Sequence, residues 1–558
     1  MSFKYEAVTI PEEWKKTPAL LTVNPLCLEV LRRRGYKTVE EVTALLYPNF
    51  SEVVKNTEFQ DSAKAIDRLA DAVHNREHIV VYQDYDVDGC SACAIMVENL
   101  RNFGGYVDYY GNDRAIDGFG MCSNGVHAIK VKYPDVKLIL TVDNGIVAFA
   151  GVETAIAEGI EVIITDHHQP GNKLPDAEAV VDLQRKDEAY PFHDFCGAGL
   201  ALKLMFALAK KLRANLNDVA KSTDLAALAT VADVVPVLGE NRAIIREGLK
   251  YINDGSRLLF QVLNAVKNEQ KITAHETLAF RYAPMINAVS RMGYDTGTVV
   301  EMMLSHDKDF VTEKVLELDK INEDRKEETK REFNVADETI DSDKLEKSIV
   351  ICDESFKEGI VGIVAGKLKE TYNRPTIVFA DVGNGILKGS GRSVEGFNLK
   401  ENLDEVRDLL LGYGGHTMAA GMTLKKENFD EFKRRFSEIA EEKVSTEVCD
   451  EPVLIDLVVH AKDLTENLLC DMSIMEPYGE GFPVPCFGLI ADIDKVFYMG
   501  KEEAHVKWVD SENGVSVITW NGAEAAKART SYPKKFVGYP SLHEYNGRVD
   551  MQFMTYTA

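Results

Sequence analysis

Short apolar runs alternate with helix-length segments from residue 61 onwards. The runs are IVVYQ (79–83), VDYYG (107–111), LILTV (138–142), VIIT (162–165) and AVVD (179–182). Runs of this length, rich in Val and Ile and separated by helical patterns, are typical of strands in βαβ units. The helical pattern after the first run consists of small residues and is expected over roughly 91–102. Because these strands lack a polar face, the pattern predicts a parallel sheet that helices cover on both sides.

The remaining segments follow other patterns. Residues 1–60 read as short helices punctuated by prolines, and residues 196–250 read as longer apolar helices. Apolar side chains recur at helical spacing in the charged segment 307–333, at Val311, Val315, Leu318 and Ile321. This spacing predicts one long helix with a single buried stripe. We expect that helix to bridge two lobes.

A second α/β lobe begins near residue 345. It opens with the strand SIVIC (348–352), a helix around IVGIVAGKLKETY, and the strand TIVFA (376–380). The glycine-rich stretch LLLGYGGHTMAAGM (409–422) follows, and its small residues after His416 read as the start of a helix. From about 450, short strands such as VKWV and VSVITW predict a small β-barrel.

The predicted fold class is therefore α/β, with two lobes joined by a long helix and followed by a β-barrel. A chain of 558 residues is too long for one core, which supports this division. The expected domains are an N-terminal helical segment (1–60), the first lobe (61–302), the connecting helix (303–344), the second lobe (345–446) and the barrel (447–558).

Composition and charge narrow the class of protein. With 45% hydrophobic and 28% charged residues, no apolar run of 18 residues and no apolar leader, we expect a cytoplasmic protein without a membrane span. Nine scattered cysteines fit reduced thiols, and Cys90 and Cys93 read as helix packing residues. The net charge of −26 excludes a surface coated in basic patches, so a nucleic acid would need a local groove or metal ions.

Acids and histidines follow three of the predicted parallel strands. Asp84, Asp86 and Asp88 follow the first, Asp143 follows the third, and Asp166, His167 and His168 follow the fourth. Ligands bind beyond the carboxyl ends of strands in open parallel sheets, so these side chains are expected on one rim. Taken alone, Asp166-His167-His168 reads equally well as a polar turn. Asp233, after an apolar helix, joins the group as a candidate, with a turn or helix-cap aspartate as the alternative.

Such a cluster predicts metal binding. Neighbouring carboxylates raise each other's pKa and cannot stay ionised together without cations. Oxygen ligands with one or two imidazoles suit Mn²⁺ or Mg²⁺, and this many ligands are enough for two ions. Two divalent cations can activate a water and stabilise an in-line displacement at phosphorus, so the residues indicate a two-metal phosphoesterase.

The motifs also carry a resemblance. DYDVDG, VDNG, TDHH and TVADVVP resemble, in this order, the four motifs of the DHH phosphoesterase superfamily, and GYGGHTMAAGM resembles the GGH motif of its DHHA1 domain. Further stretches are similar to the single-strand-specific exonucleases of the RecJ family: DGFG (117–120), CGAGLALKL (196–204), ENR (240–242), PMINAVSRM (284–292), GSGRS (389–393) and EPYGEGFP (476–483). The similarity spans about 60–558, and the final strands fit the OB-type barrel of these enzymes.

The resemblance implies roles for individual residues. The implied metal ligands are Asp84, Asp86, Asp143, His167 and Asp233, with Asp88 completing the first motif. His168 would contact the scissile phosphate, and Asp166 would orient a histidine. The implied substrate-binding residues are Asn287, Arg291, Ser390, Arg392, Gly415 and His416. Without the motifs, Arg291 and Arg392 read as surface arginines and His416 as a packed turn histidine.

Five places depart from the family pattern. Met285 stands where the family usually has arginine, Ser290 where it has glycine, Phe356-Lys357 where it has Trp-His, Phe482 where it has asparagine, and Asp182 where it has Asn-Pro. None is an expected metal ligand, so the departures bear on substrate grip rather than hydrolysis. Together with the acidic charge they suggest a divergent branch of phage or mobile-element origin.

The implied function is a metal-dependent, 5′→3′ exonuclease of single-stranded DNA in recombination and repair, in a bacterial or phage-infected cell. A single-strand-binding protein or a helicase would be its expected partner. One alternative is a phosphodiesterase of short RNA or cyclic dinucleotides, against which the C-terminal barrel speaks. The other is an inactive replication scaffold, against which the complete ligand set speaks.

Overall fold

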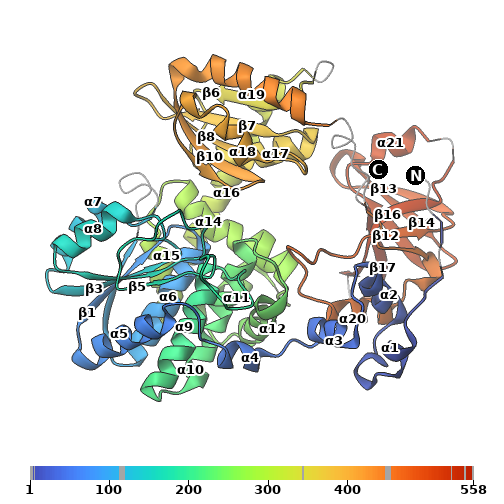
Figure 1. The fold of residues 1–558 in the computed structure, drawn as a ribbon. Helices are drawn as coiled ribbons and strands as arrows, with labels where there is room; N and C mark the ends of the chain where they lie inside the picture. The colour runs from blue at the N-terminus through green and yellow to red at the C-terminus, as the bar shows by residue number, and fades with distance from the viewer. Residues whose placement is uncertain are drawn as a thin grey trace.

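The computed structural model describes residues 4–5, 7–111, 120–269, 271–341, 345–445, 454–529, 531–545 and 548–555, with the side chains of 501 and 542–550 excepted. Residues 117–119 of the DGFG stretch lie outside this set. Figure 1 shows three parts: a lobe of blue, cyan and green elements, a yellow and orange lobe above it, and a red β-domain to one side that the first helices contact.

The first lobe is built on a parallel sheet, as predicted, with strand order β2-β1-β3-β4-β5. Its strands are β1 (His78–Gln83), β2 (Tyr106–Gly111), β3 (Val136–Val142), β4 (Glu161–Thr165) and β5 (Ala179–Val181). Alternate residues of β1 enter different cores: Ile79 and Val81 pack on one face, Val80 and Tyr82 on the other. The sheet is therefore two-faced, which explains its unbroken apolar strands.

Helices cover both faces. One face carries α6 (Val87–Asn102) and α9 (Gly197–Leu212), behind which lie α10 (Leu216–Lys221), α11 (Thr223–Ala232) and α12 (Gly239–Asn253). The opposite face carries α7 (Ser123–Lys132), which the sequence patterns did not predict, and α8 (Phe149–Ala157). Cys90 and Cys93 are buried on α6, as expected for packing residues.

The predicted connecting helix is α16 (Lys308–Glu338), and its four predicted stripe residues are buried. It follows α13 (Leu258–Lys267), the π-helix η2 (Ala274–Tyr282), α14 (Ala283–Arg291) and α15 (Gly297–Leu304). Helix α16 packs against α13 and α14 of the first lobe and against α17 (Val361–Tyr372) of the second. It therefore bridges the two lobes, as Figure 1 shows.

The second lobe contains a mixed sheet in the order β6-β7-β8-β10-β9, in which only β6 and β7 run parallel. Its elements are β6 (Ile349–Asp353), α17 (Val361–Tyr372), β7 (Thr376–Asp381), β8 (Ile386–Arg392), α18 (Leu399–Asp404), β9 (Leu410–Gly415), β10 (Ala419–Lys425) and α19 (Phe429–Lys443). The expected helix after His416 is wrong, because that segment is strand β10. Ala420, Met422 and Leu424 are buried at a spacing of two residues, which is the period of a strand.

The C-terminal domain is a seven-stranded sheet, which confirms the expected small β-domain. Its order is β11-β12-β16-β17-β15-β14-β13. Its elements are β11 (Leu457–His460), α20 (Glu466–Ile474), β12 (Phe487–Ile490), β13 (Lys495–Met499), β14 (His505–Asp510), β15 (Val515–Thr519), α21 (Ala523–Lys527), β16 (Lys535–Tyr545) and β17 (Arg548–Thr555).

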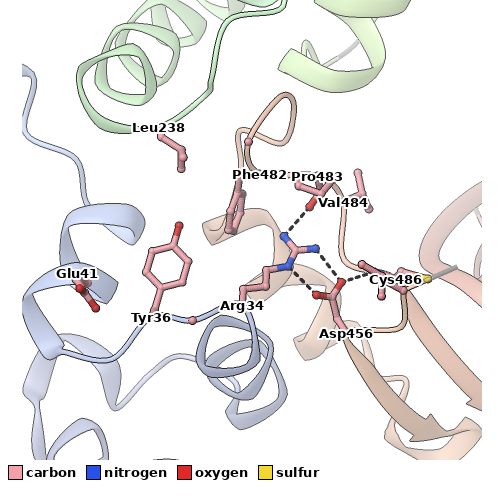
Figure 2. A pocket seen from close by; sticks show the side chains of 12 residues that line it. Arg34, Tyr36, Glu41, Leu238, Asp456, Phe482, Pro483, Val484 and Cys486 are labelled. Carbon is pink, nitrogen blue, oxygen red and sulfur yellow. Dashed lines mark hydrogen bonds and ion pairs between the residues drawn. The ribbon is translucent and has the colours of Figure 1, made fainter. Parts of the chain in front are cut away.

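The short N-terminal helices, also predicted, link this domain to the first lobe. They are α1 (Glu12–Lys16), α2 (Pro25–Arg33), α3 (Val39–Leu46) and α4 (Phe50–Lys55). Just after α2, Arg34 donates two hydrogen bonds of 2.8 Å to Asp456 and one of 2.7 Å to the Pro483 carbonyl, beside a cavity of about 900 Å³ (Figure 2). No helix in the described part of the chain is long and apolar enough to cross a membrane.

Candidate metal centre and substrate cleft

The predicted rim exists, because β1, β3 and β4 run parallel and end at the same edge of the sheet. Asp143 follows β3 with a φ of 61°, a left-handed backbone that costs energy for a non-glycine residue. Asn144 holds this turn: its side chain donates to the Val142 carbonyl at 2.9 Å and to the Tyr82 carbonyl at 3.2 Å. The strained position of Asp143 is therefore imposed by neighbouring strands.

The first motif lies at the start of α6, which begins at Val87 rather than near residue 91 as expected. Asp86 caps the helix, since its Oδ1 accepts hydrogen bonds from the amides of Asp88 and Gly89 at 2.9 and 3.1 Å. Val87 N donates to Asn287 Oδ1 at 3.0 Å. Asn287 thus also anchors the helix start, in addition to its predicted place beside the substrate.

Asp88 connects two helices. Its oxygens accept hydrogen bonds from Gly197 N at 2.6 Å and Ala198 N at 2.8 Å, the first amides of α9. A Cβ at Gly197 would lie 2.7 Å from Asp143 Cβ, closer than atoms can approach. Glycine therefore allows α9 to reach the cluster. The resemblance includes CGAGLALKL (196–204), but it did not indicate that Gly197 is needed for this close approach.

Among the residues that the structure describes, three overlapping groups could hold metal ions, each with potential ligand atoms within 4.8 Å of one another. The groups are Asp84, Asp86 and Asp143; Asp88, His167 and Asp233; and Asp143, His167 and His168. All five predicted metal ligands therefore lie in one cluster. Asp233 lies at the C-terminal end of α11, where its turn geometry brings it to the cluster.

Unsatisfied atoms in the cluster fit cations. His167 Nε2 lies 3.0 Å from Asp143 Oδ1 and 3.7 Å from Asp233 Oδ2. Each of these three atoms is buried and lacks a hydrogen-bond partner in the described part of the chain. Buried polar atoms are rarely left unpaired, because their desolvation is then uncompensated. Converging carboxylate and imidazole atoms of this kind fit Mn²⁺ or Mg²⁺.

The electrostatics agree with this reading. Burial, reinforced by the charge of Asp86, raises the pKa of Asp84 to about 8. Burial and the charge of Asp88 raise the pKa values of Asp143 and Asp233 well above their ordinary value. Burial lowers the pKa of His167, which keeps its imidazole neutral, as a metal ligand must be.

Asp166 and His168 form a pair at the edge of the cluster, where His168 also belongs to the third candidate group. Asp166 Oδ1 lies 2.7 Å from His168 Nδ1, and its Oδ2 accepts a hydrogen bond from Ile146 N at 2.8 Å. Burial alone would lower the pKa of His168, but the hydrogen bond and charge of Asp166 raise it to about 9. Asp166 therefore orients His168 and favours its charged form.

A cleft of about 780 Å³ extends from the cluster across both lobes. Its lining includes Asp86 and His168. It also includes all six predicted substrate residues: Asn287, Arg291, Ser390, Arg392, Gly415 and His416. Arg291 and Arg392 both line the cleft, so two guanidinium groups face the same space. Burial and the nearby charge of Arg291 lower the pKa of Arg392. Two arginines in one cleft of an acidic protein suit an anionic ligand.

The departures from the family pattern lie mostly in packed positions. Met285, Phe356, Phe482 and Asp182 are buried. Phe482 stacks on Tyr478 at 5.8 Å between ring centroids, and its ring lies beside the Arg34 guanidinium (Figure 2), whose Cζ is 5.0 Å from the ring centroid. Phe482 does not line the cleft. Lys357 pairs with Glu328 at 3.4 Å. Ser290 alone of these positions lines the cleft.

Sequence reasoning missed other cleft residues. Tyr85, Glu358, Lys388 and Tyr413 also line the space. Lys388 had a readable signal, because it precedes Ser390 and Arg392 at intervals of two residues in one strand. No sequence pattern pointed to Glu358, because it belongs to none of the motifs and lies in the loop between β6 and α17.

Comparisons with known families divide the chain in the same order. Residues 78–231 match the DHH family, N-terminal domain; residues 346–442 match the DHHA1 domain; and residues 455–556 match the RecJ OB domain. These are the three domain types that the motifs indicated.

Relatives match over most of the chain. A single-stranded-DNA-specific exonuclease RecJ from Bacillus subtilis is 34% identical over 544 residues, covering 96% of this chain and 68% of the relative. The Escherichia coli protein of the same name is 32% identical and covers 83% of each chain.

Solved structures agree. The crystal structure of RecJ in complex with Mn²⁺ from Thermus thermophilus matches with a TM-score of 0.82 and 28% identity, over 99% of this chain and 79% of that one. A second structure from the same organism contains Mg²⁺. With its sequence, three domain types and overall fold in agreement, this chain belongs to the RecJ family of DHH phosphoesterases.

Proposed function

We propose that this protein is a metal-dependent exonuclease that digests single-stranded DNA in the 5′→3′ direction. The observation that carries the proposal is the continuity of two features. A cluster of buried, unsatisfied carboxylate and imidazole atoms opens into a cleft that presents Arg291 and Arg392. The first feature suits divalent cations, and the second suits the phosphates of a nucleic acid.

Asp84, Asp86, Asp143, His167 and Asp233 would hold two Mn²⁺ or Mg²⁺ ions. When bound, such ions supply an activated water and stabilise charge at the scissile phosphate. Asp88 belongs to one of the candidate ligand groups, and its two hydrogen bonds from α9 amides would fix the position of its carboxylate within the cluster.

The chain's own groups position the substrate. His168, whose Nδ1 is engaged by Asp166, keeps Nε2 to donate a hydrogen bond to the scissile phosphate. Arg291 and Arg392 would grip the phosphate backbone, with Ser390, Asn287, Gly415 and His416 beside them. The cleft draws its walls from both lobes, and in this proposal it would admit one strand and exclude a duplex.

The same site has two alternative uses. Short RNA or a cyclic dinucleotide would present the same phosphodiester to the cluster. The seven-stranded C-terminal domain favours a longer single strand, since OB-type domains bind such strands by stacking and charge. An inactive scaffold has no need of the five candidate ligands, which are all present and grouped.

The test uses one single-stranded DNA oligonucleotide labelled at either end, incubated with Mn²⁺ or with chelator, beside RNA and duplex copies. We expect Mn²⁺-dependent release of labelled mononucleotide from the 5′-labelled strand. Cleavage of only RNA or a cyclic dinucleotide would contradict single-stranded DNA as the substrate and would favour the alternative function. Release from the 3′ label first would reverse the direction.

The cellular setting and the domain limits are also proposals. The enzyme would act in the cytoplasm of a bacterial or phage-infected cell, on strands that a helicase or a single-strand-binding protein exposes during recombination and repair. The domain limits would fall at 1–60, 61–302, 303–344, 345–446 and 447–558.

A further inference from the structure

Strand β8 presents a row of polar side chains to the cleft. Along this strand Leu387 and Gly391 are buried, whereas Lys388, Ser390 and Arg392 are partly exposed and line the cleft. Successive residues of a strand point to opposite faces, so these three share one face at steps of about 6.6 Å. That step is comparable with the spacing of successive phosphates along an extended single strand.

The surface beside this row is smooth. In the paired strands, Lys388 lies opposite Thr423 and Thr423 opposite Gly412, while Ser390 lies opposite Gly421 and Gly421 opposite Gly414. The three glycines have open space where a side chain would be. Glycine allows a ligand to approach the backbone closely. No side chain of these glycines therefore separates the surface beside Ser390 from the surface beside Lys388.

Lys388 is paired with an acid inside the cleft. Its Nζ lies 3.1 Å from Glu358 Oε1, and both side chains line the space that holds Arg291 and Arg392. The loop carrying Glu358 packs closely against the end of α14, because a Cβ at Gly359 would lie 2.1 Å from the Arg291 carbonyl oxygen. The Lys388 and Glu358 side chains remain 39% and 27% exposed, so water screens the pair and a stronger anion can displace it.

We propose that Lys388 binds a phosphate of the DNA strand next to the one held by Ser390 and Arg392, and that Glu358 is an internal competitor for Lys388. In the free protein the carboxylate of Glu358 forms an ion pair with the ammonium group of Lys388. On binding, a phosphate takes its place and Glu358 turns to solvent. This inference rests on the proposed function, since it assigns two further residues of the same cleft to substrate selection.

One consequence is selection by phosphate number. A ligand with a single phosphate can occupy Ser390 and Arg392 but gains nothing from Lys388, which stays with Glu358. A strand with two or more phosphates gains the second contact. Lys388 thus favours a polymer over a mononucleotide product, and Glu358 limits how much affinity this second contact adds.

The experiment measures binding of a fluorescent single-stranded DNA oligonucleotide by anisotropy, in chelator so that no hydrolysis occurs, at a series of salt concentrations. We expect Lys388→Met to raise the Kd about tenfold at low salt, the loss of one good charged contact. It should also reduce the slope of log Kd against log salt by about 0.7, the value for one phosphate of a single strand. Lys388→Arg should restore the slope.

Glu358→Gln should lower the Kd about threefold, because it removes the competitor without removing the lysine. The change in Kd caused by Glu358→Gln should be smaller in the Lys388→Met background, because Glu358 then has no lysine for which to compete with the phosphate. Lys433→Met is the matched control: it removes an exposed lysine of α19, whose apolar residues pack on the other face of this sheet. We expect it to leave Kd and slope unchanged, with melting temperatures reported for every variant.

The outcomes separate the two proposals. If the unaltered chain neither binds the strand in chelator nor digests it in Mn²⁺, the proposed function falls and this inference falls with it. If the unaltered chain digests the strand in Mn²⁺ but does not bind it in chelator, the cleft does not hold phosphates by itself and only the inference is overturned. If the unaltered chain binds, but Lys388→Met keeps the same Kd and salt slope, only the inference is overturned. A lower melting temperature for Lys388→Met and Glu358→Gln with an unchanged slope would likewise show that the pair is structural.

Discussion

Gly197 offers a sharp test of the metal centre, because a single methyl group placed there enters the cluster without touching the substrate. A Cβ at this position would lie 2.7 Å from Asp143 Cβ, 3.0 Å from Asp143 Cα and 3.1 Å from Asp88 Oδ2. All three atoms belong to residues that line or support the proposed metal site. The variant Gly197→Ala therefore forces either α9 or the Asp143 turn to move.

The magnitude follows from these distances. Carbon atoms in contact lie about 3.5–4.0 Å apart, so one side must move by about 1 Å. Moving α9 lengthens the hydrogen bonds of 2.6 and 2.8 Å that its amides give Asp88. A misplacement of about 1 Å at a catalytic site costs about 100-fold in rate, and overpacking costs about 1–3 kcal/mol of stability.

The assay compares kcat on single-stranded DNA, the Kd for Mn²⁺ and the melting temperature. Gly366→Ala is the control, because this glycine lies within α17 and a Cβ there meets nothing within 4 Å. We expect the control to keep full activity and to gain about 0.5–1 kcal/mol of stability. A Gly197→Ala variant with unchanged kcat and unchanged Mn²⁺ affinity would refute the packing of α9 against the metal site.

Three further predictions concern individual charged groups. Asp166→Asn should lower kcat about 100-fold with little change in Mn²⁺ affinity, because the His168 ring loses its charged partner, whereas the Asn oxygen can still accept the His167 amide; a parallel loss of metal binding would contradict this separation. Mn²⁺ at 100-fold its Kd should stabilise the protein by about 2.7 kcal/mol, and His167→Ala should abolish most of that thermal shift; an equal shift in the variant would count against His167 as a ligand. Burial raises the pKa of Glu332 from 4.5 to about 7, so the folded chain keeps a proton that the unfolded chain releases, and stability falls as pH rises between these values. Glu332→Gln should flatten that fall in urea titrations at pH 5 and pH 8, and an unchanged difference between the two pH values would contradict the assignment.

The position of the site was predictable from sequence for a topological reason. Parallel strands deliver their carboxyl ends to one edge, so Asp84, Asp143 and His167 had to meet once the strands were recognised. The stripe of α16 was predictable because helical periodicity depends only on local spacing. Strand ends and helical stripes can be predicted because each depends on a short, continuous stretch of the chain.

Other features depend on contacts between distant segments. The small-residue pattern predicts a helix that starts near residue 91, whereas Asp86 caps a helix that begins at Val87. Strand β10 was taken for a helix because Gly and Ala weaken both patterns, although Ala420, Met422 and Leu424 alternate. The Glu358–Lys388 pair joins a loop to a strand 30 residues later. No periodicity predicts such a pair.

The central claim is that the Asp and His cluster digests single-stranded DNA from an end. The most direct measurement compares linear and circular single strands of the same sequence in Mn²⁺, with His167→Ala as the inactive control. The account predicts that the linear strand is converted to mononucleotides by the unaltered chain only, while the circle stays intact. Cutting of the circle, or equal digestion of the linear strand by His167→Ala, would contradict it.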